Sequence, residues 1–147
     1  MWRGVSGRGS ATSRFVMVVG AGGTVLVVED DDSMCQAIER LLKAGGFECA
    51  TYASADALLA RGVDKESPYV ISDLRLPGLS GLDLLAALRE QKISLPFILI
   101  TGHDSPGLRE KALLSGATAY LPKPFRGTKL LDSVRAAIES PRPSGWQ

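Results

Sequence analysis

Residues 69–78, Tyr-Val-Ile-Ser-Asp-Leu-Arg-Leu-Pro-Gly, are the stretch from which the rest of the chain can be interpreted. A short apolar run ends in the carboxylate of Asp73, and Pro77 and Gly78 then break the pattern. Such a run, bounded by turn residues, is typical of a buried strand. We therefore expect Asp73 at the carboxyl end of a strand, the edge at which α/β sheets hold their ligands.

Strands and helices are predicted to alternate on both sides of this stretch. Apolar runs predict further strands at 24–28, 97–101 and 119–121, and a weaker, alternating pattern predicts an edge strand at 48–53. Helices are expected to begin after a cap at Asp32 or Ser33, at Ser54, after a cap at Ser80, and at about Leu108 and Thr128. Their expected buried faces are Met34, Ile38, Leu41 and Leu42; Leu82, Leu85 and Leu88; and Leu130, Leu131, Val134, Ala137 and Ile138. Short connections between strands and helices predict βαβ units and a parallel sheet.

The composition fits one globular domain. The chain has 147 residues, of which 45% are hydrophobic and 22% are charged. A net charge of +1 gives no reason to expect nucleic-acid binding through bulk electrostatics. No apolar run approaches the roughly 18 residues of a membrane helix. We expect a cytoplasmic protein whose two cysteines, Cys35 and Cys49, are reduced and half-buried.

The two ends of the chain differ from its middle. Residues 1–23 are rich in Gly, Ser and Arg, and are expected to form a flexible leader, either an over-long start before Met17 or a cloning remnant. Residues 141–147 are expected to form a mobile tail. Gly20, Gly22 and Gly23 precede a strand, and Val25 stands where a dinucleotide-binding fingerprint has its third glycine. A Rossmann oxidoreductase is therefore a weak alternative.

Chemically compatible side chains follow the strong strands. Glu29 and Asp30 follow the first strand, Asp73 and Thr101 end the third and fourth, and Lys123 follows the fifth. Neighbouring carboxylates resist ionising together without a cation, and Mg²⁺ takes one or two carboxylates with waters and a phosphate oxygen. Asp can be a nucleophile that forms an aspartyl phosphate, while Thr and Lys can contact the phosphoryl oxygens. Each residue alone has a structural explanation, but four converging strand ends favour a phosphoryl-transfer site.

Four motifs carry a family resemblance. They are Val-Val-Glu-Asp-Asp (27–31), Ser-Asp-Leu-Arg-Leu-Pro-Gly-Leu-Ser-Gly (72–81), Ile-Leu-Ile-Thr-Gly-His (98–103) and Leu-Pro-Lys-Pro-Phe (121–125). In combination they resemble the CheY-like receiver domain of two-component response regulators, most closely the nitrogen-fixation and nodulation subgroup. The resemblance covers about residues 24–140. It implies the flavodoxin-like α/β fold, a doubly wound five-stranded parallel sheet with strand order 2-1-3-4-5 in three α/β/α layers.

The resemblance also implies roles for the acidic residues. Asp73 would be the phosphoacceptor. Mg²⁺ (or Mn²⁺) would be held by Asp30, Asp73 and the backbone carbonyl of Arg75, with Glu29 acting largely through water. Glu29 stands where many relatives have Asp, and its longer arm puts the metal geometry or affinity in doubt. A receiver that is not phosphorylated and serves only as an interaction module is therefore kept as an alternative.

Further roles follow from the same resemblance. Thr101 and Lys123 would contact the phosphoryl group, with the Gly102 amide nearby, and Tyr120 would be the aromatic switch that moves with Thr101. The Lys123–Pro124 bond would be cis. Arg75 and His103, the only histidine, occupy positions that tune the lifetime of the acyl phosphate. For His103, an exposed loop residue without a function is an equally good interpretation.

The function implied is that of a phosphoacceptor rather than a turnover enzyme. A sensor histidine kinase or phosphotransfer protein would supply the phosphoryl group, and the surface of the fourth helix, fifth strand and fifth helix would change and support a homodimer. We expect a stand-alone receiver, with the receiver portion of a DNA-binding regulator as the alternative. A hydrolase of the haloacid dehalogenase type is disfavoured, because Arg75 stands where such enzymes have a second Asp.

Overall fold

Five parallel strands form one sheet at the centre of the computed structural model, which describes residues 24–63 and 69–139. The strands are β3 (Thr24–Val28), β4 (Glu48–Tyr52), β5 (Tyr69–Asp73), β6 (Phe97–Thr101) and β7 (Ala119–Pro122). Their order is β4-β3-β5-β6-β7, which is the 2-1-3-4-5 order expected from the resemblance. β5 and β6 are buried at every position, whereas the edge strand β4 has no fully buried residue.

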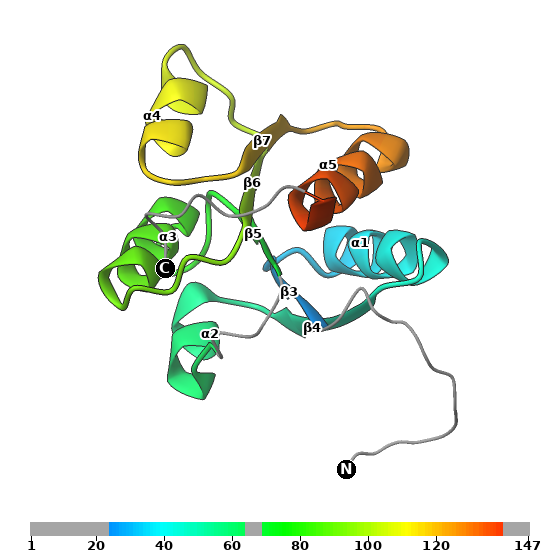
Figure 1. The fold of residues 1–147 in the computed structure, drawn as a ribbon, viewed down its shortest axis with the longest axis horizontal. Helices are drawn as coiled ribbons and strands as arrows, with labels where there is room; N and C mark the ends of the chain where they lie inside the picture. Colours follow the sequence, from blue (N-terminus) through cyan, green and yellow to red (C-terminus); the bar gives the residue numbers. More distant parts are fainter. Residues whose placement is uncertain (1–23, 64–68, 140–147) are drawn as a thin grey trace.

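Helices cover both faces of this sheet. They are α1 (Asp32–Ala44), α2 (Ala55–Arg61), α3 (Gly81–Glu90), α4 (Leu108–Leu114) and α5 (Gly127–Glu139). Figure 1 shows α1 and α5 on one face and α2, α3 and α4 on the other. The two faces bury separate apolar clusters, one around Leu84, Leu88 and Leu99 and the other around Ile38, Ile98 and Val134. The predicted three-layer α/β/α fold is thus confirmed.

Two details of the predicted helices are wrong. The first helix is capped by Asp31, whose carboxylate accepts hydrogen bonds from the amides of Ser33 and Met34, and not by Asp32 or Ser33. In α3 the fully buried leucines are Leu84, Leu85 and Leu88, while Leu82 is only partly buried. With Gly81 as the first helical residue, positions 81, 84, 85 and 88 share the face turned to the sheet.

The other predicted elements agree with the structure to within one or two residues at their ends. Ser54 and Ser80 cap α2 and α3 as predicted, and Ser80 forms a capping box with Asp83. Met34, Leu41 and Leu131 are partly buried members of the predicted faces, and Leu130, Val134 and Ala137 are buried. The leader, the tail and the side chain of Ile138 lie outside the described residues. None of the helices in the described ranges is long and apolar enough to cross a membrane.

Candidate functional site

Three carboxylates lie together at the carboxyl ends of β3 and β5. Glu29 directly follows β3, Asp73 ends β5, and the two strands pair with Val28 opposite Ser72. Glu29, Asp30 and Asp73 each offer an oxygen atom, and these three oxygens lie within 4.8 Å of one another. Glu29 and Asp73 are 3% and 7% exposed, whereas Asp30 is exposed. The cluster is therefore buried on the side of the sheet and open to solvent at Asp30.

Lys123, which follows β7, offsets part of the negative charge of this cluster. Its Nζ donates to Glu29 Oε1 at 3.0 Å and to Asp73 Oδ2 at 3.3 Å. The Lys123 amide donates to the carbonyl of Thr101 at 2.6 Å, which fixes the lysine beside the end of β6. The Lys123–Pro124 bond is cis, as the resemblance implied. Lys123 thus joins the ends of three strands through its backbone and its side chain.

Burial and the neighbouring charges shift the protonation of this group. Loss of solvent raises the pKa of Glu29, the Asp73 carboxylate adds to the rise, and Lys123 opposes it. Burial alone would lower the pKa of Lys123, but the Glu29 and Asp73 carboxylates outweigh it and raise that pKa. A cationic Lys123 therefore stabilises two carboxylates that would otherwise be held close together with little solvent.

The donor set of this site fits a hard divalent cation. All three side chains offer carboxylate oxygens and none offers sulfur or nitrogen, which matches the preference of Mg²⁺ and Mn²⁺. Asp30 faces solvent, so the cluster has an open side for water ligands. Two buried carboxylates next to one lysine leave net negative charge, which favours a further cation.

Thr101 and the two residues after it lie beside Lys123. Thr101 is fully buried, and its Oγ1 accepts a hydrogen bond from the His103 amide at 2.9 Å. A Cβ added at Gly102 would lie 3.8 Å from Cδ of Lys123. The side chain of His103 is exposed, as is that of Arg75 after β5. The structure therefore brings Thr101, Gly102 and Lys123 together and leaves Arg75 and His103 at the rim.

Gly81 is a site residue that sequence reasoning missed. A Cβ at this position would collide with the backbone carbonyl oxygen of Asp73 and would come within 2.8 Å of Leu99. The Gly81 amide also donates to the carbonyl of Leu74 at 2.8 Å. Gly81 therefore lets α3 begin against the backbone of Asp73. Its place in the Leu-Ser-Gly motif was visible in the sequence, but the contact depends on how α3 packs.

Tyr120 is buried in β7, and its partners were also missed. Its hydroxyl donates to Asp104 Oδ1 at 2.6 Å, and its carbonyl accepts from Arg109 Nη1 at 3.3 Å. The Arg109 guanidinium carbon lies 5.8 Å from the centre of the tyrosine ring. Burial, followed by the hydrogen bond to Asp104, raises the pKa of Tyr120 to about 12. No pattern in the sequence links Asp104 and Arg109 to Tyr120.

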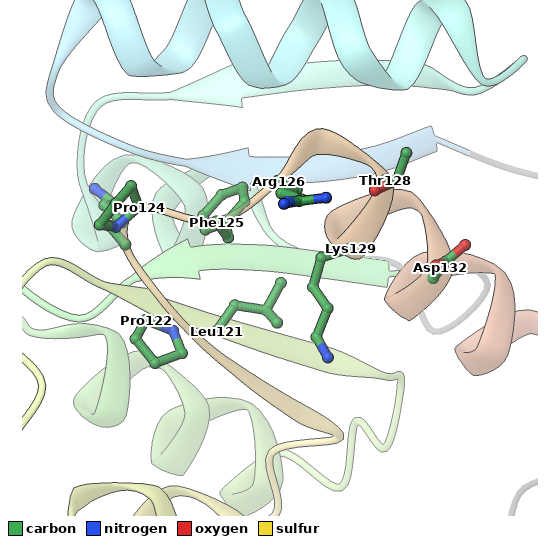
Figure 2. Close-up of a pocket in the computed structure, with 9 residues that line it drawn as sticks. Leu121, Pro122, Pro124, Phe125, Arg126, Thr128, Lys129 and Asp132 are labelled. Carbon is green, nitrogen blue, oxygen red and sulfur yellow. The ribbon is translucent and has the colours of Figure 1, made fainter.

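A separate hollow lies between β7 and the start of α5, as Figure 2 shows. It has a volume of about 450 Å³. Its apolar side includes Leu121 and Phe125, and Lys129 and Asp132 of α5 contribute polar groups. Lys123 borders it, but the three carboxylates do not line it. The hollow is therefore adjacent to the carboxylate cluster rather than part of it.

Both cysteines are free thiols and are half-buried, in agreement with the prediction. Burial raises the pKa of Cys35 and of Cys49. A raised pKa keeps a thiol protonated at neutral pH, and the protonated thiol is a poor nucleophile. Neither cysteine is therefore a candidate for the reactive group of this protein.

The sequence model of the response regulator receiver domain family matches residues 25–135 of this chain. This chain belongs to that family. Receiver domains are phosphoacceptors of two-component systems that generally bind Mg²⁺ at an acidic pocket, and they interact with histidine kinases or phosphotransfer proteins. The fold with strand order 2-1-3-4-5 and the position of the carboxylates agree with this membership.

Named relatives agree with the family assignment. Nodulation protein W of Bradyrhizobium diazoefficiens is 38% identical over 141 residues, which is 96% of this chain and 59% of that protein. The transcriptional regulatory protein FixJ of Rhizobium meliloti is 34% identical over 116 residues, 79% of this chain and 57% of that protein. The chain thus spans less than two thirds of the length of these relatives.

Solved receiver structures show the same fold. The crystal structure titled FixJ-N is 31% identical with a TM-score of 0.73, covering 83% of this chain and 98% of the other. The receiver domain of Francisella response regulator 1452 is 28% identical with a TM-score of 0.74, covering 80% of this chain and 98% of the other. These matches confirm the predicted CheY-like fold, and the relatives Nodulation protein W and FixJ confirm the predicted likeness to FixJ-type receivers.

Proposed function

We propose that this receiver accepts a phosphoryl group on the carboxylate of Asp73, supplied by a sensor histidine kinase or a phosphotransfer protein. The observation that carries the proposal is the geometry around Asp73. Its carboxylate is buried, is contacted by Lys123 Nζ at 3.3 Å, and lies beside two further carboxylates. A carboxylate held in this way is oriented and lies close to the groups that a phosphoryl group needs.

The proposed reaction is a displacement at phosphorus. An oxygen of Asp73 attacks the phosphorus, the bond from phosphorus to the histidine nitrogen of the partner breaks, and the nitrogen keeps the electron pair. Lys123 balances the charge of the phosphoryl oxygens, and the Thr101 hydroxyl and Gly102 amide donate hydrogen bonds to them. Positioning and charge neutralisation provide most of the rate in this class of reaction.

A divalent ion, Mg²⁺ or Mn²⁺, would be held by Asp30, Asp73 and the backbone carbonyl of Arg75, with Glu29 acting through water. When bound, such an ion neutralises charge on the transferring phosphoryl oxygens. Glu29 meanwhile accepts from Lys123 at 3.0 Å and from the Asp31 amide at 3.2 Å. These two contacts hold Glu29 on the buried side of the cluster. The exposed Asp30 is therefore the more direct ligand of the metal ion in this proposal.

Release of the phosphoryl group completes the proposed cycle. Water attacks the phosphorus of the aspartyl phosphate, inorganic phosphate leaves, and the carboxylate of Asp73 is restored. The chain therefore works as a phosphoacceptor that promotes its own dephosphorylation, and not as an enzyme acting on a separate substrate. We place the receiver domain at residues 24–140 and its action in the cytoplasm, without direct contact to nucleic acid or membrane.

The proposed output is a change in the surface formed by α4, β7 and α5. Thr101 and Tyr120 would be the switch residues, because Thr101 ends β6 and Tyr120 lies in the adjacent strand β7. Leu113 and Leu114 of α4 are 43% and 88% exposed, so this surface carries apolar side chains that a partner or a second copy of the chain can cover. We propose that the phosphorylated chain forms a homodimer through this surface.

The deciding experiment is intact mass after incubation with acetyl phosphate and Mg²⁺. We expect the mass of one phosphoryl group to be gained by the native chain, and the gain to disappear with Asp73→Asn or with EDTA. Asp32→Asn is the matched control, because it removes an exposed carboxylate from the nearby first turn of α1. No gain in the native chain would instead identify a receiver that is not phosphorylated.

We also predict that Arg75 and His103 set the lifetime of the aspartyl phosphate. Both side chains are exposed, and each lies two residues after a site residue, Asp73 or Thr101. They are therefore placed at the rim where water would enter. Replacing both with Ala should change the dephosphorylation rate several-fold, measured as phosphate release after removal of the donor. An unchanged rate would contradict this role.

A further inference from the structure

The loop between β6 and α4, residues 102–107, is tied to Tyr120 at both of its ends. Near its start, Asp104 Oδ1 accepts a hydrogen bond from the Tyr120 hydroxyl at 2.6 Å. Just past its end, Arg109 Nη1 donates to the Tyr120 carbonyl at 3.3 Å, with the guanidinium over the ring. A distance of 2.6 Å is in the range of a charge-assisted hydrogen bond from a hydroxyl to a carboxylate. Tyr120 therefore fixes the position of this loop.

The same loop orients the hydroxyl of Thr101. The His103 amide donates to Thr101 Oγ1 at 2.9 Å. A hydroxyl has one proton to donate and lone pairs with which to accept. Because a lone pair accepts from His103, the proton of Thr101 is directed to another acceptor. Asp104 is the next residue after His103, so an anchor at Asp104 restrains the peptide whose amide holds Thr101.

We propose that Asp104 is a positioning residue, which holds the Tyr120 ring in its buried orientation and thereby keeps the Thr101 hydroxyl ready to donate to a phosphoryl oxygen. The proposal rests on the function proposed above, because it concerns the affinity of the same site for a phosphoryl group. It adds a residue outside the carboxylate cluster and outside the Lys123 contacts.

Asp104 is well suited to this role by its surroundings. The Tyr120 side chain is buried at 3% exposure, whereas Asp104 itself is exposed. The carboxylate thus reaches inward from a surface loop to a hydroxyl at the edge of the core. The ion pairs of Lys43 and Lys123 with their acidic partners do not involve Asp104. Its carboxylate accepts the hydrogen bond from the Tyr120 hydroxyl.

The test combines two readouts in the full chain. The first is ¹⁹F NMR of protein labelled with 3-fluorotyrosine, in which the Tyr120 resonance is assigned with Tyr120→Phe and observed without any phosphoryl group. The second is binding of beryllium fluoride with Mg²⁺, which imitates a phosphoryl group on a carboxylate. The variants are Asp104→Ala, which removes the acceptor, and Asp104→Asn, which keeps an oxygen at the same place. Ser105→Ala is the matched control in the same exposed loop.

We expect Asp104→Ala to move the Tyr120 resonance towards that of an exposed tyrosine and to weaken beryllium fluoride binding about fivefold, the effect of one hydrogen bond. Asp104→Asn should keep the Tyr120 resonance and the affinity for beryllium fluoride close to their native values. Ser105→Ala should change neither the resonance nor the affinity. Adding Tyr120→Phe to Asp104→Ala should weaken binding little further, because both changes break the same contact.

Two results would overturn the proposal. The Tyr120 resonance could stay in place in Asp104→Ala, or it could move while the affinity for beryllium fluoride stays at the native value. If the native chain itself bound no beryllium fluoride, the proposed phosphoacceptor function would be contradicted. The proposed effect of Asp104 on the phosphoryl site would then be contradicted as well. That outcome differs from a failure of Asp104 alone, in which the native chain binds and all variants bind equally well.

Discussion

Lys123 is the residue on which the charge balance of the candidate site depends. Its ammonium contacts Glu29 and Asp73, whose side chains are 1% and 11% exposed. Two carboxylates with so little solvent repel each other when no cation lies between them. A lysine in this position therefore stabilises the folded chain in addition to any part in chemistry.

Lys123→Met is expected to lower the free energy of unfolding at pH 7 in EDTA by about 1.5–3 kcal/mol, the range for hydrogen bonds to charged groups. The loss arises because Glu29 and Asp73 keep their burial without a cationic partner. Chemical denaturation followed by circular dichroism measures it. The double change Glu29→Gln/Lys123→Met should recover most of the loss, and Lys129→Met in α5 is the matched control. Equal stability of Lys123→Met and the native chain would contradict this account.

Tyr120 predicts a dependence of stability on alkaline pH. Its pKa is about 12 in the folded chain against 10.0 for an ordinary tyrosine. Between these values the folded chain keeps a proton that the unfolded chain loses. The contribution to stability is therefore complete below pH 10 and is lost as the pH rises towards 12.

The measurement is the free energy of unfolding of the native chain and of Tyr120→Phe at pH 9 and pH 11. Because lysines also titrate in this range, the difference between the two proteins is the quantity to compare. We expect the advantage of the native chain to shrink at pH 11. A difference that does not change with pH would show that the hydroxyl is not held by burial and Asp104.

At the scale of elements, three helices end in the same backbone motif. In a Schellman motif, two amides after the helix bond back to carbonyls in its last turn. The motif closes α1 with Phe47 to Leu42 and Gly46 to Lys43, α3 with Ile93 to Leu88 and Lys92 to Arg89, and α4 with Ala117 to Ala112 and Gly116 to Leu113. Its left-handed residue is a glycine in α1 and α4 but Lys92, with a φ of 62°, in α3.

Lys92→Gly is therefore expected to stabilise the chain. A residue with a Cβ is strained in this conformation, although glycine also gains freedom in the unfolded chain, so the net gain should be about 0.5–1 kcal/mol. Gly46→Ala is the reciprocal test, because an added Cβ at that position has nothing within 4 Å and only the backbone is strained. It should cost about 1 kcal/mol. The denaturant midpoints of Lys92→Gly and Gly46→Ala measure the two effects. The midpoint should rise in Lys92→Gly and fall in Gly46→Ala, and any other combination would contradict this account.

At the scale of the whole molecule, the sequence was sufficient for the features that local patterns determine. Continuous apolar runs revealed β5 and β6, and the residue after each strong strand was readable directly, so the convergence of Glu29, Asp73 and Lys123 could be predicted. The strand order followed from the family resemblance, since pattern alone leaves several parallel arrangements open. The fold class was therefore predictable before any contact was known.

What the sequence did not reveal depends on contacts between distant segments. Asp31, Asp32 and Ser33 are all of good capping types, and only the backbone conformation at the start of α1 shows that Asp31 is the cap. Gly81 packs against the backbone of Asp73, so the helix face that contains positions 81, 84, 85 and 88 is turned to the sheet. Leu84 is therefore fully buried and Leu82 only partly. Tyr120 and Asp104 are 16 residues apart in the sequence, and only the fold brings them together. No short-range pattern contains these relations.

Arg89 stabilises the edge of the sheet that lies opposite the candidate site. From the last turn of α3, its guanidinium donates to the carbonyls of Ile93 at 2.8 Å, Leu95 at 3.1 Å and Gly116 at 2.7 Å. These carbonyls precede β6 and β7, so the arginine joins two connections at the amino ends of the strands. Asp73 and Thr101 lie at the carboxyl ends of β5 and β6.

We therefore expect Arg89→Met to lower the free energy of unfolding by about 2 kcal/mol, the scale of lost hydrogen bonds to a charged group. Arg89→Lys should fall between it and the native chain, because an ammonium cannot reproduce the planar fork of a guanidinium. Arg135→Met on the exposed side of α5 is the matched control. The phosphoryl group gained from acetyl phosphate at 10 °C, where all variants stay folded, should be the same in all four proteins. A loss of phosphoryl uptake in folded Arg89→Met would instead show that the two edges of the sheet are coupled.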